Sequence, residues 1–413
     1  MLFGFSSSAR GKNLPEGKDK IKIDSISIRK NWRTKERIIL RELGINAGDS
    51  VSTEQIQTAI SKIWNIGNFA KVNYRIDTLR DERLLLKVYA QDAFTIMPIL
   101  SFTGNRNEYL LTLGISDKNF LGRNIGLDLA GSFGTNAQYA KVNIDIPRQL
   151  LYRNMTLHGS FVLGEAQNYR YSNEVKTSGI AYLQKQASFS IGNPYHTDYY
   201  YTFSPNLGIS YLSQRTDSTL LAPGVPSSGN YQINYLGIST SESIGMINRI
   251  RNQQDGRLLS AGIGVGIGMD SESPEYVSMG LSGIYSKLLS KVVELDAGFS
   301  TAYTTAKLPS LINYLGPGQV KGILSGERSG QSIYSALASA NFTYINRDWF
   351  ALDQSFFANI GNATDVYLNL FKTSPLFSVG SRVRIVIPMI PWLGISFYYA
   401  YRGKGKHWYS MDF

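Results

Sequence analysis

The sequence predicts a mainly β protein, in which an N-terminal α+β domain precedes a transmembrane antiparallel β-barrel of about sixteen strands. Three observations predict this class. Both helical patterns of the chain lie before residue 94. After residue 94, strand-length segments follow one another, and apolar and polar residues alternate in each of them. These segments have about ten residues or more, as tilted membrane strands require, and no run reaches the ~18 apolar residues of a transmembrane helix.

The N-terminal domain is expected over residues 20–93, after an N-terminal extension over residues 1–19. Its apolar residues alternate first as in a strand, then recur with the period of two helices, and finally alternate over two further strands. The order β-α-α-β-β predicts two helices packed on one face of a three-stranded sheet. The expected elements are a strand at 20–30, helices at 35–43 and 53–65, and strands at 69–76 and 82–90.

Residues at the ends of both helices carry capping chemistry. Thr34 and Thr53 stand at the two starts, where a hydroxyl oxygen can accept a hydrogen bond from an unpaired backbone N–H group. Gly44 and Gly67 follow the two helices, and glycine adopts the left-handed conformation that ends many helices. We therefore expect the threonines as N-caps and the glycines as stops.

Apolar and polar residues alternate along strand-length segments throughout the second domain, residues 94–413. A soluble β-sandwich also alternates. Here, however, charges and glycines recur on the polar face over more residues than one sandwich needs, and aromatic residues lie near strand ends as in membrane girdles. In lipid every backbone donor must be paired, so strands can span only as a closed barrel. The glycines of AGIGVGIGMD, residues 261–270, have period two, unlike a phosphate-binding loop, and we expect them to face the barrel interior.

Composition argues against several classes of function. The chain has no cysteine and only three histidines, His158, His196 and His407, so neither a thiolate site nor a compact histidine metal site is expected. The net charge of +11 is spread along the chain, so nucleic acid is not an expected partner. No G-x-S-x-G motif occurs, and we expect neither an enzyme activity nor a cofactor.

The start MLFGFSSSARGK lacks the basic and apolar regions of a secretory signal peptide.

A long loop interrupts the barrel strands at about residues 307–331. Its centre, LGPGQVKGILSGER, runs from Leu315 to Arg328 and is polar and rich in glycine. Loops of this length are uncommon between neighbouring strands, and many of them are functional. The residues alone also allow a plain surface loop.

Two stretches carry a resemblance to a known family. ERIILRELGINAGDSVSTEQIQTAISKIWNIGNFAKVNYRI, residues 36–76, has the pattern of a POTRA domain. SDKNFLGRNIGL, residues 116–127, resembles the first hairpin of the barrel that follows such domains. From about Lys20 to Phe413 the chain therefore resembles the outer-membrane assembly and translocation superfamily, which joins POTRA domains to a bacterial surface antigen barrel. This superfamily contains BamA, TamA, the mitochondrial Sam barrel and the two-partner-secretion transporters.

The resemblance implies a site at the long loop. In that superfamily the sixth extracellular loop folds into the lumen, and its V-R-G-[FY] tip docks on an F-x-D-x-G strand. The matching residues here are the loop tip Val320, Lys321, Gly322 and Ile323 and the docking residues Phe357, Asn359 and Gly361. Lysine and asparagine replace the arginine and aspartate of the family, so a bidentate ion pair becomes at best an ordinary charge–dipole hydrogen bond. Glu327 and Arg328 could supply a substitute contact.

The resemblance also implies a function. We expect a factor that inserts proteins into a bacterial outer membrane or translocates them across it, with the POTRA-like domain in the periplasm. That domain would capture an unfolded outer-membrane or secreted client by strand addition, and pass it to the lumen or to a seam between the first and last barrel strands. Membrane lipid and accessory periplasmic or lipoprotein subunits are the other expected partners. The aromatic C-terminal strand that assembly machinery reads is matched by Tyr409, Met411 and Phe413.

Two alternative functions stay open. The first is a dedicated two-partner-type secretion transporter, and the second is a passive channel or receptor whose lumen favours anions. In the channel, inward-facing cationic side chains would line the lumen. They are Lys141, Arg382, Arg384 and Arg402. A large and steady conductance would indicate a channel, and a small or flickering one a plugged barrel.

Overall fold

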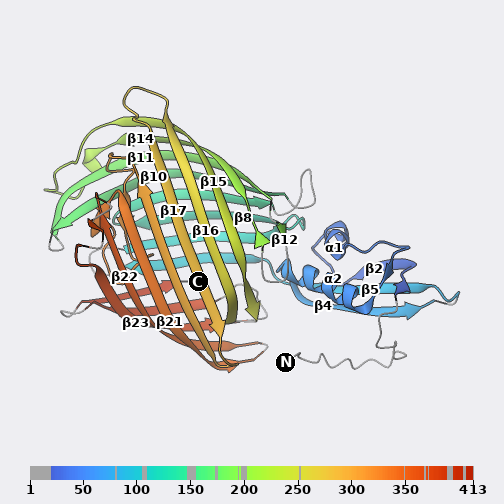
Figure 1. The fold of residues 1–413 in the computed structure, drawn as a ribbon. Coiled ribbons are helices and arrows are strands. Elements are labelled where there is room, and N and C mark those ends of the chain that lie inside the picture. Colours follow the sequence, from blue (N-terminus) through green and yellow to red (C-terminus); the bar gives the residue numbers. More distant parts are fainter. Residues whose placement is uncertain are drawn as a thin grey trace. The chain divides into compact units, whose positions relative to one another are not determined.

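The structure is a computed structural model of the 413-residue chain. It divides into two compact units, of which one ends at Ala93 and the other begins at Phe94 (Figure 1). The residues that it describes are 20–79, 81–104, 109–146, 155–172, 175–193, 195–196, 202–250, 253–347, 349–366, 369–370, 372–387, 394–402 and 406–412. No helix within these ranges is both long enough and apolar enough to cross a membrane.

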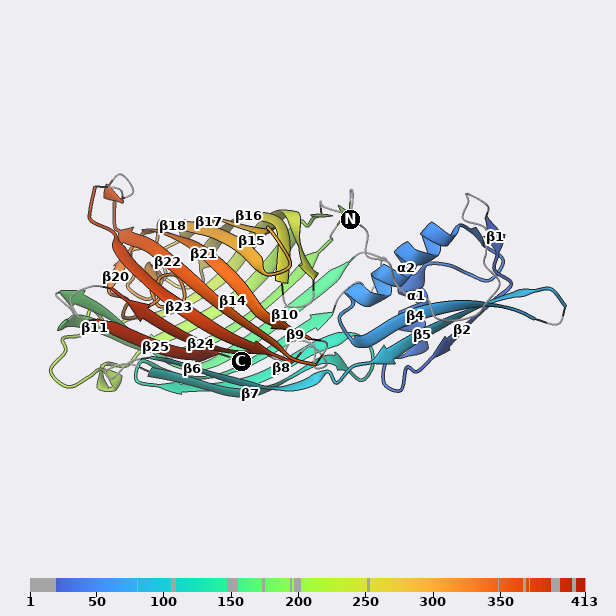
Figure 2. The same cartoon turned by 90° about the horizontal axis from the view of Figure 1, so that it is seen from below.

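The first unit has the expected β-α-α-β-β order, with one additional short ladder. Its elements are β1 (Ile21–Lys22), β2 (Ser25–Arg29), α1 (Glu36–Leu43), β3 (Ser50–Val51), α2 (Thr53–Asn65), β4 (Phe69–Thr78) and β5 (Leu84–Asp92). A three-stranded sheet has the strand order β2-β5-β4, in which β2 runs parallel and β4 antiparallel to β5. Both helices lie on one side of this sheet (Figure 2). The two-residue ladder joins β1 to β3.

Aliphatic side chains hold the first unit together. Ile39 of α1 and Ile56 and Ile63 of α2 are completely buried, and they pack in one cluster with Leu86 and Val88 of β5. Burying each such side chain contributes roughly 1.5–3 kcal/mol. The apolar face that the helical period predicts is therefore the face that covers the sheet.

The structure corrects both predicted N-caps. Lys35 precedes α1 and makes no side-chain capping bond. Thr34 is buried instead, because the carboxylate of Asp92 at the end of β5 accepts hydrogen bonds from its hydroxyl and its backbone N–H. The N-cap of α2 is Ser52, one residue before the predicted Thr53, and Ser52 forms a reciprocal capping box with Gln55. The long-range contact with Asp92 explains why Thr34 is not an N-cap. The capping box of Ser52 and Gln55 explains why α2 has its N-cap one residue earlier than predicted.

The predicted helix stops behave differently from each other. Gly44 has a φ of 63° and its N–H donates to the carbonyl oxygen of Leu40, so it ends α1 in the left-handed conformation. The C-cap of α2 is Ile66, which keeps a right-handed conformation. Gly67 follows with a φ of 81°, so the chain turns there.

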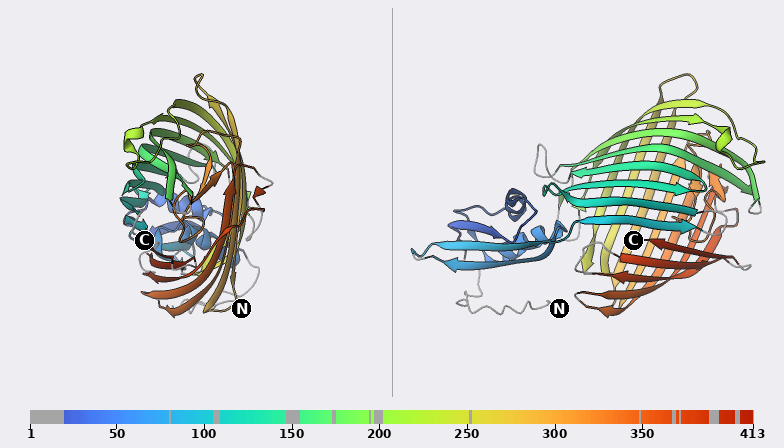
Figure 3. Two further views of the ribbon diagram at one scale, coloured as in Figure 1. Left: turned by 90° about the vertical axis from the view of Figure 1, so that its left-hand side faces the viewer. Right: turned by 180° about the vertical axis from the view of Figure 1, so that it is seen from behind.

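The second unit is a closed antiparallel barrel, so the alternative of a β-sandwich is wrong. Sixteen strands make its wall among the described residues (Figures 1 and 3). They are β6 (Ile96–Gly104), β7 (Tyr109–Phe120), β8 (Ile125–Gly134), β9 (Ala137–Ile146), β10 (Thr156–Ser172), β11 (Val175–Gly192), β14 (Asn206–Thr216), β15 (Gln232–Ile250), β16 (Gln253–Gly268), β17 (Tyr276–Leu288), β18 (Val293–Thr304), β21 (Ser332–Asn346), β22 (Ala351–Thr364), β23 (Leu376–Val386), β24 (Gly394–Tyr401) and β25 (His407–Asp412). Two short pieces, β12 (Tyr195–His196) and β13 (Thr202–Phe203), extend the hairpin between β11 and β14. The wall closes where β25 pairs with β6.

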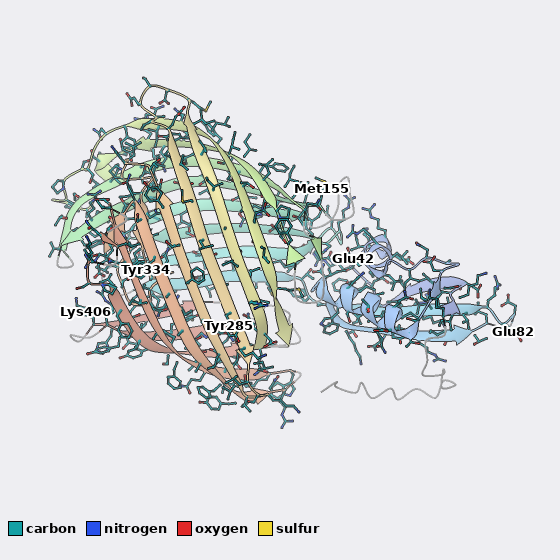
Figure 4. All side chains as sticks on the ribbon, viewed as in Figure 1. Glu42, Glu82, Met155, Tyr285, Tyr334 and Lys406 are labelled. Carbon is teal, nitrogen blue, oxygen red and sulfur yellow. The ribbon has the colours of Figure 1, made fainter. Side chains whose placement is uncertain are left out.

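Side chains of the barrel alternate between an apolar outer wall and a lumen. On β16, Ile263 and Val265 are 47% and 40% exposed, as expected for side chains that face lipid. The glycines between them face the other way, and a Cβ built on Gly264 would meet the side chains of Ser239 and Ser278. Tyr285 of β17, labelled in Figure 4, belongs to the outer wall. The period of two therefore assigns each face as the sequence predicts.

Candidate functional site

The long loop between β18 and β21, residues 305–331, packs against the inner wall of the barrel, and we call it the lumenal loop. Its base is a ladder between β19 (Asn313–Leu315) and β20 (Arg328–Gly330). Beyond that ladder, Val320 is completely buried and Ile323 is 1% exposed. They form one apolar cluster with Ile333 of β21 and Ala363 of β22. The loop thus buries its apolar residues inside the barrel.

Glycines on both sides of the contact let the backbones approach. A Cβ built on Gly361 of β22 would lie 2.8 Å from Cγ2 of Val320 and 2.9 Å from the backbone oxygen of Tyr334. At the loop tip, Gly322 has a φ of 86°, and a Cβ there would lie 3.4 Å from Cβ of Ala400. Left-handed φ values favour glycine. The motif glycines at both ends are therefore required by space and by conformation.

Lys321 and Asn359 have different partners, so the expected hydrogen bond between them is replaced. The ammonium of Lys321 lies 4.7 Å from the ring centre of Tyr398 on β24 and 5.6 Å from that of Trp408 on β25. Asn359 is 3% exposed, and its amide donates to the hydroxyl of Ser378 at 3.4 Å. A cation is attracted to the face of an aromatic ring. The loop tip is thus tied to strands beyond β22, near the end of the chain.

The strongest polar contact of the loop is an ion pair between Glu327 and Arg402. Nη1 and Nη2 of Arg402 each donate to one carboxylate oxygen of Glu327 at 2.6 Å, and the two side chains are 9% and 10% exposed. Nη1 also donates to the backbone oxygen of Gly322 at 3.4 Å. Bidentate arginine–carboxylate pairs are strong and fix geometry. The pair therefore ties the lumenal loop to the residue that directly follows β24.

The pairing joins two residues that sequence reasoning treated separately. Glu327 was expected only as a substitute contact of unknown partner, and Arg402 only as a charge lining the lumen. They lie 75 positions apart, and no local spacing relates them. Arg328, the other candidate, lies in β20 and pairs in register with Leu315. Only the closed barrel brings Arg402, directly after β24, against the loop.

The opposite end of the lumenal loop contacts the other side of the barrel. The phenol of Tyr231 donates to the hydroxyl of Ser310 at 2.7 Å, and that hydroxyl donates to Oε1 of Gln214 at 2.6 Å. Burial raises the pKa of Tyr231, so its phenol stays protonated and able to donate. On the other side of the loop, Gly326, which directly precedes Glu327, lies against the backbone of Tyr169 on β10. Because β10 and β14 lie far from β24 in the strand order, the loop crosses the lumen.

The four predicted lumen charges do not gather at one place. Arg384 donates twice to one carboxylate oxygen of Asp353, at 3.0 and 2.7 Å. Arg382 donates to Ser355 at 2.7 Å and to Asn341 at 3.3 Å. Lys141 lies on β9, in register with Val162 of β10, away from the three arginines. Within the described ranges no group of three or more His, Cys, Asp or Glu residues could hold a metal ion.

Closure of the barrel depends on a short pairing between β25 and β6, which we call the seam. Among the described residues it has four register pairs, whereas β24 and β25 share six and β6 and β7 share nine. The four pairs are Tyr409–Gly104, Ser410–Thr103, Met411–Phe102 and Asp412–Ser101. Tyr409 and Met411 therefore lie on the strand that closes the barrel, and Phe413 lies outside the described residues. Fewer ladder bonds make this joint weaker than its neighbours.

Comparisons with known proteins bear on both units. Residues 21–90 match the family model described as POTRA, surface antigen variable number repeat. The whole chain is similar in structure to BamA from Haemophilus ducreyi lacking POTRA domains 1–3, with a TM-score of 0.61 and 16% identity over 95% of this chain and 84% of that one. No curated protein matches the sequence.

Two further solved structures have the same fold. CdiB from Acinetobacter baumannii aligns with a TM-score of 0.59 and 13% identity, over 94% of this chain and 73% of that one. CdiB from Escherichia coli aligns with a TM-score of 0.60 and 8% identity, over 100% and 92%. The chain therefore has the POTRA-plus-barrel fold of the outer-membrane assembly and translocation superfamily to which BamA and the two-partner-secretion transporters belong.

Proposed function

We propose that this protein inserts other proteins into a bacterial outer membrane or moves them across it. The POTRA domain, in the periplasm, receives an unfolded client, and the barrel passes that client to the membrane at its seam. No bond-making chemistry and no cofactor are needed, because the client folds by pairing its own strands. Accessory periplasmic or lipoprotein subunits would bring the client or the energy of its delivery.

The observation that carries the proposal is the seam. Four register pairs hold β25 to β6, and separating them exposes two strand edges with unpaired N–H and C=O groups. Such edges template an incoming strand. The lumenal loop crosses the barrel interior, so a lateral exit through the seam is the less obstructed path.

The first unit offers the matching receiving surface. In its sheet, β2 and β4 are the edge strands, and β5 is paired on both sides. An extended client segment can add to either edge through main-chain hydrogen bonds, which do not depend on the client's sequence. Sequence tolerance of this kind suits a factor that handles many clients.

Locking the seam tests the proposal. The chain has no cysteine, so the register partners Phe102 and Met411 can be replaced by the only cysteine pair, F102C with M411C. Facing positions on neighbouring antiparallel strands lie within disulfide range. In cells depleted of the natural protein, the oxidised variant should fail to restore folded outer-membrane barrels, and a reductant should restore them.

Matched controls decide what a result means. Each single cysteine variant should support normal levels of folded barrels under both redox conditions. Full activity of the oxidised pair would refute lateral passage through the seam. Heat-modifiable migration on a gel, without boiling, shows that each variant is a folded barrel.

A dedicated secretion transporter is the second candidate, and the similarity to two CdiB structures favours it. The depletion experiment separates the two. If folded barrels in general stay at their normal level and one secreted protein accumulates inside the cell, the dedicated transporter is the correct function. A passive anion channel is disfavoured, since Arg382, Arg384 and Arg402 each hold polar or acidic partners.

A further inference from the structure

We propose that the first unit carries a lipid-binding surface, with which it binds anionic phospholipid headgroups of the membrane that the barrel spans. The surface consists of residues 29–37, which we call the basic segment, and of Trp64 near the end of α2. The proposal goes beyond the proposed function, because binding of lipid by this surface involves no client.

The basic segment joins β2 to α1 and concentrates positive charge. Its sequence, RKNWRTKER, has five cationic residues and one acidic residue, Glu36. Lys30, Lys35 and Arg37 are exposed. Clusters of roughly four to eight lysine or arginine residues next to a membrane-spanning segment are typical of surfaces that bind acidic lipids. The charge of the basic segment therefore indicates an anionic partner.

Two exposed tryptophans accompany this charge. Trp32, inside the basic segment, is 68% exposed, and Trp64 of α2 is 49% exposed. Neither belongs to the apolar cluster that packs between the helices and the sheet. Tryptophan is enriched at membrane–water interfaces, where its ring lies at the level of the headgroups. A charged loop that is only solvated has no need of an exposed indole ring, so the combination favours a lipid surface.

Backbone hydrogen bonds hold both tryptophans at one end of the first unit. The N–H of Thr34, in the basic segment, donates to the carboxylate of Asp92, the last residue of β5, at 3.0 Å. The N–H of Ala93 donates to the oxygen of Asn68, in the turn after α2, at 2.9 Å. The first bond fixes the basic segment, and the second fixes the end of α2, where the chain leaves the sheet.

The same end of the first unit continues into the barrel. Three residues, 93–95, separate Asp92 from β6, which is a strand of the barrel wall. Four residue steps of fully extended chain span at most about 14 Å. The length of the chain therefore keeps the basic segment close to a membrane strand. Such a short tether raises the effective concentration of the surface at the membrane, so a modest intrinsic affinity suffices.

The opposite end of β5 provides matched controls. The turn between β4 and β5 contains Glu82, which is labelled in Figure 4, and the exposed side chains of Leu79 and Arg83. The nine residues of β5 put this turn roughly 30 Å from Asp92, at about 3.3 Å per residue. R83Q and L79A thus remove a cation and an apolar side chain where no lipid contact is expected.

Photo-crosslinking of the full-length protein in phospholipid vesicles tests the surface. The vesicles contain phosphatidylcholine, alone or mixed with anionic phosphatidylglycerol, and a trace of phosphatidylcholine with a diazirine near its headgroup. We expect adducts on residues 29–37 and on Trp64 in the anionic vesicles, and far fewer in the zwitterionic ones. K30Q, K35Q and R37Q should each lower the yield by up to about fivefold, the factor that one cation contributes at an anionic surface.

The remaining variants and the salt dependence separate lipid binding from other effects. W32A should also lower the yield, whereas R83Q and L79A should not change it. High salt should lower it in the unaltered protein, because salt screens exposed charges. Slow hydrogen exchange of the β5 amides shows that the first unit of each variant is folded.

Two results would overturn the proposal. The first is an equal yield from both kinds of vesicle, or an equal loss of yield in R83Q. The second concerns a protein partner, which a photoreactive amino acid in place of Trp32 detects in cells. A crosslink from this position to a periplasmic protein, without lipid adducts in vesicles, would assign the surface to that protein. Because the vesicles contain no client, either result is independent of the proposed function.

Discussion

Replacing Gly361 by alanine should push the lumenal loop off the barrel wall. The new Cβ would lie 2.8 Å from Cγ2 of Val320, 2.9 Å from the backbone oxygen of Tyr334 and 3.2 Å from Cδ1 of Leu315. The contact with the Tyr334 oxygen lies within the barrel wall and is present whether or not the loop is docked, whereas undocking of the loop relieves the contacts with Val320 and Leu315. Overpacking of this kind costs about 1–3 kcal/mol. The undocked population of the loop should therefore rise about 5- to 150-fold, at 1.4 kcal/mol for each factor of ten.

Thiol labelling measures that population. In the cysteine-free chain, I323C places a single thiol at a position that is 1% exposed when the loop is docked. Maleimide labelling of I323C with G361A should be faster than labelling of I323C alone by the factor given above. The matched control is G298A, because a Cβ on Gly298 of β18 would meet only the backbone oxygen of Gly283, at 3.6 Å. Equal labelling rates for the two alanine variants would refute the steric argument.

Three further predictions concern the loop tip, the lumen and the first unit. K321A removes a cation from two aromatic rings, worth about 0.5–2 kcal/mol, and should slow client assembly while gel mobility still shows a folded barrel; normal assembly at a normal protein level would contradict this role. Deletion of residues 316–326 should convert a small or flickering conductance in planar bilayers into a larger, steadier one, whereas a large conductance in the intact protein would contradict a loop that crosses the lumen. S52A should lower the free energy of local opening of α2 by about 1 kcal/mol in hydrogen exchange, because the capping box is lost, and T53A should have a smaller effect if Ser52 is the true N-cap.

Much of the fold is local and could be predicted. Side chains along a strand point to alternate faces, with a period of two residues. The alternation of apolar and polar residues along β16 and β23 was therefore enough to assign the lumen and lipid sides. A helical period of apolar residues likewise placed α1 and α2, and Gly44 marked the end of α1 through its own conformational freedom. These predictions depend only on residues that are neighbours in sequence. They were confirmed because the lipid around the barrel and the sheet under the helices each bury one apolar face, and the spacing of apolar residues in the sequence defines that face.

Capping residues show where local reasoning ends. Thr34 has the chemistry of an N-cap, but a buried carboxylate at Asp92 offers its hydroxyl and backbone N–H a better set of partners. That carboxylate is 58 positions away. A hydrogen bond of a charged acceptor in a buried site outweighs a cap that water can replace.

The sequence by itself determined the class of the protein, the two units and the glycines that a docked loop requires. Only the tertiary structure decided which residues hold the loop against the barrel wall. Closing sixteen strands into a barrel puts Arg402 and Trp408 beside the tip of a loop that starts about a hundred positions earlier, and Lys321 and Glu327 take the nearest partners that this closure supplies. Ion pairs and cation–π contacts depend on the distance between the partners in space. Residues far apart in the sequence carry no local pattern that predicts this distance.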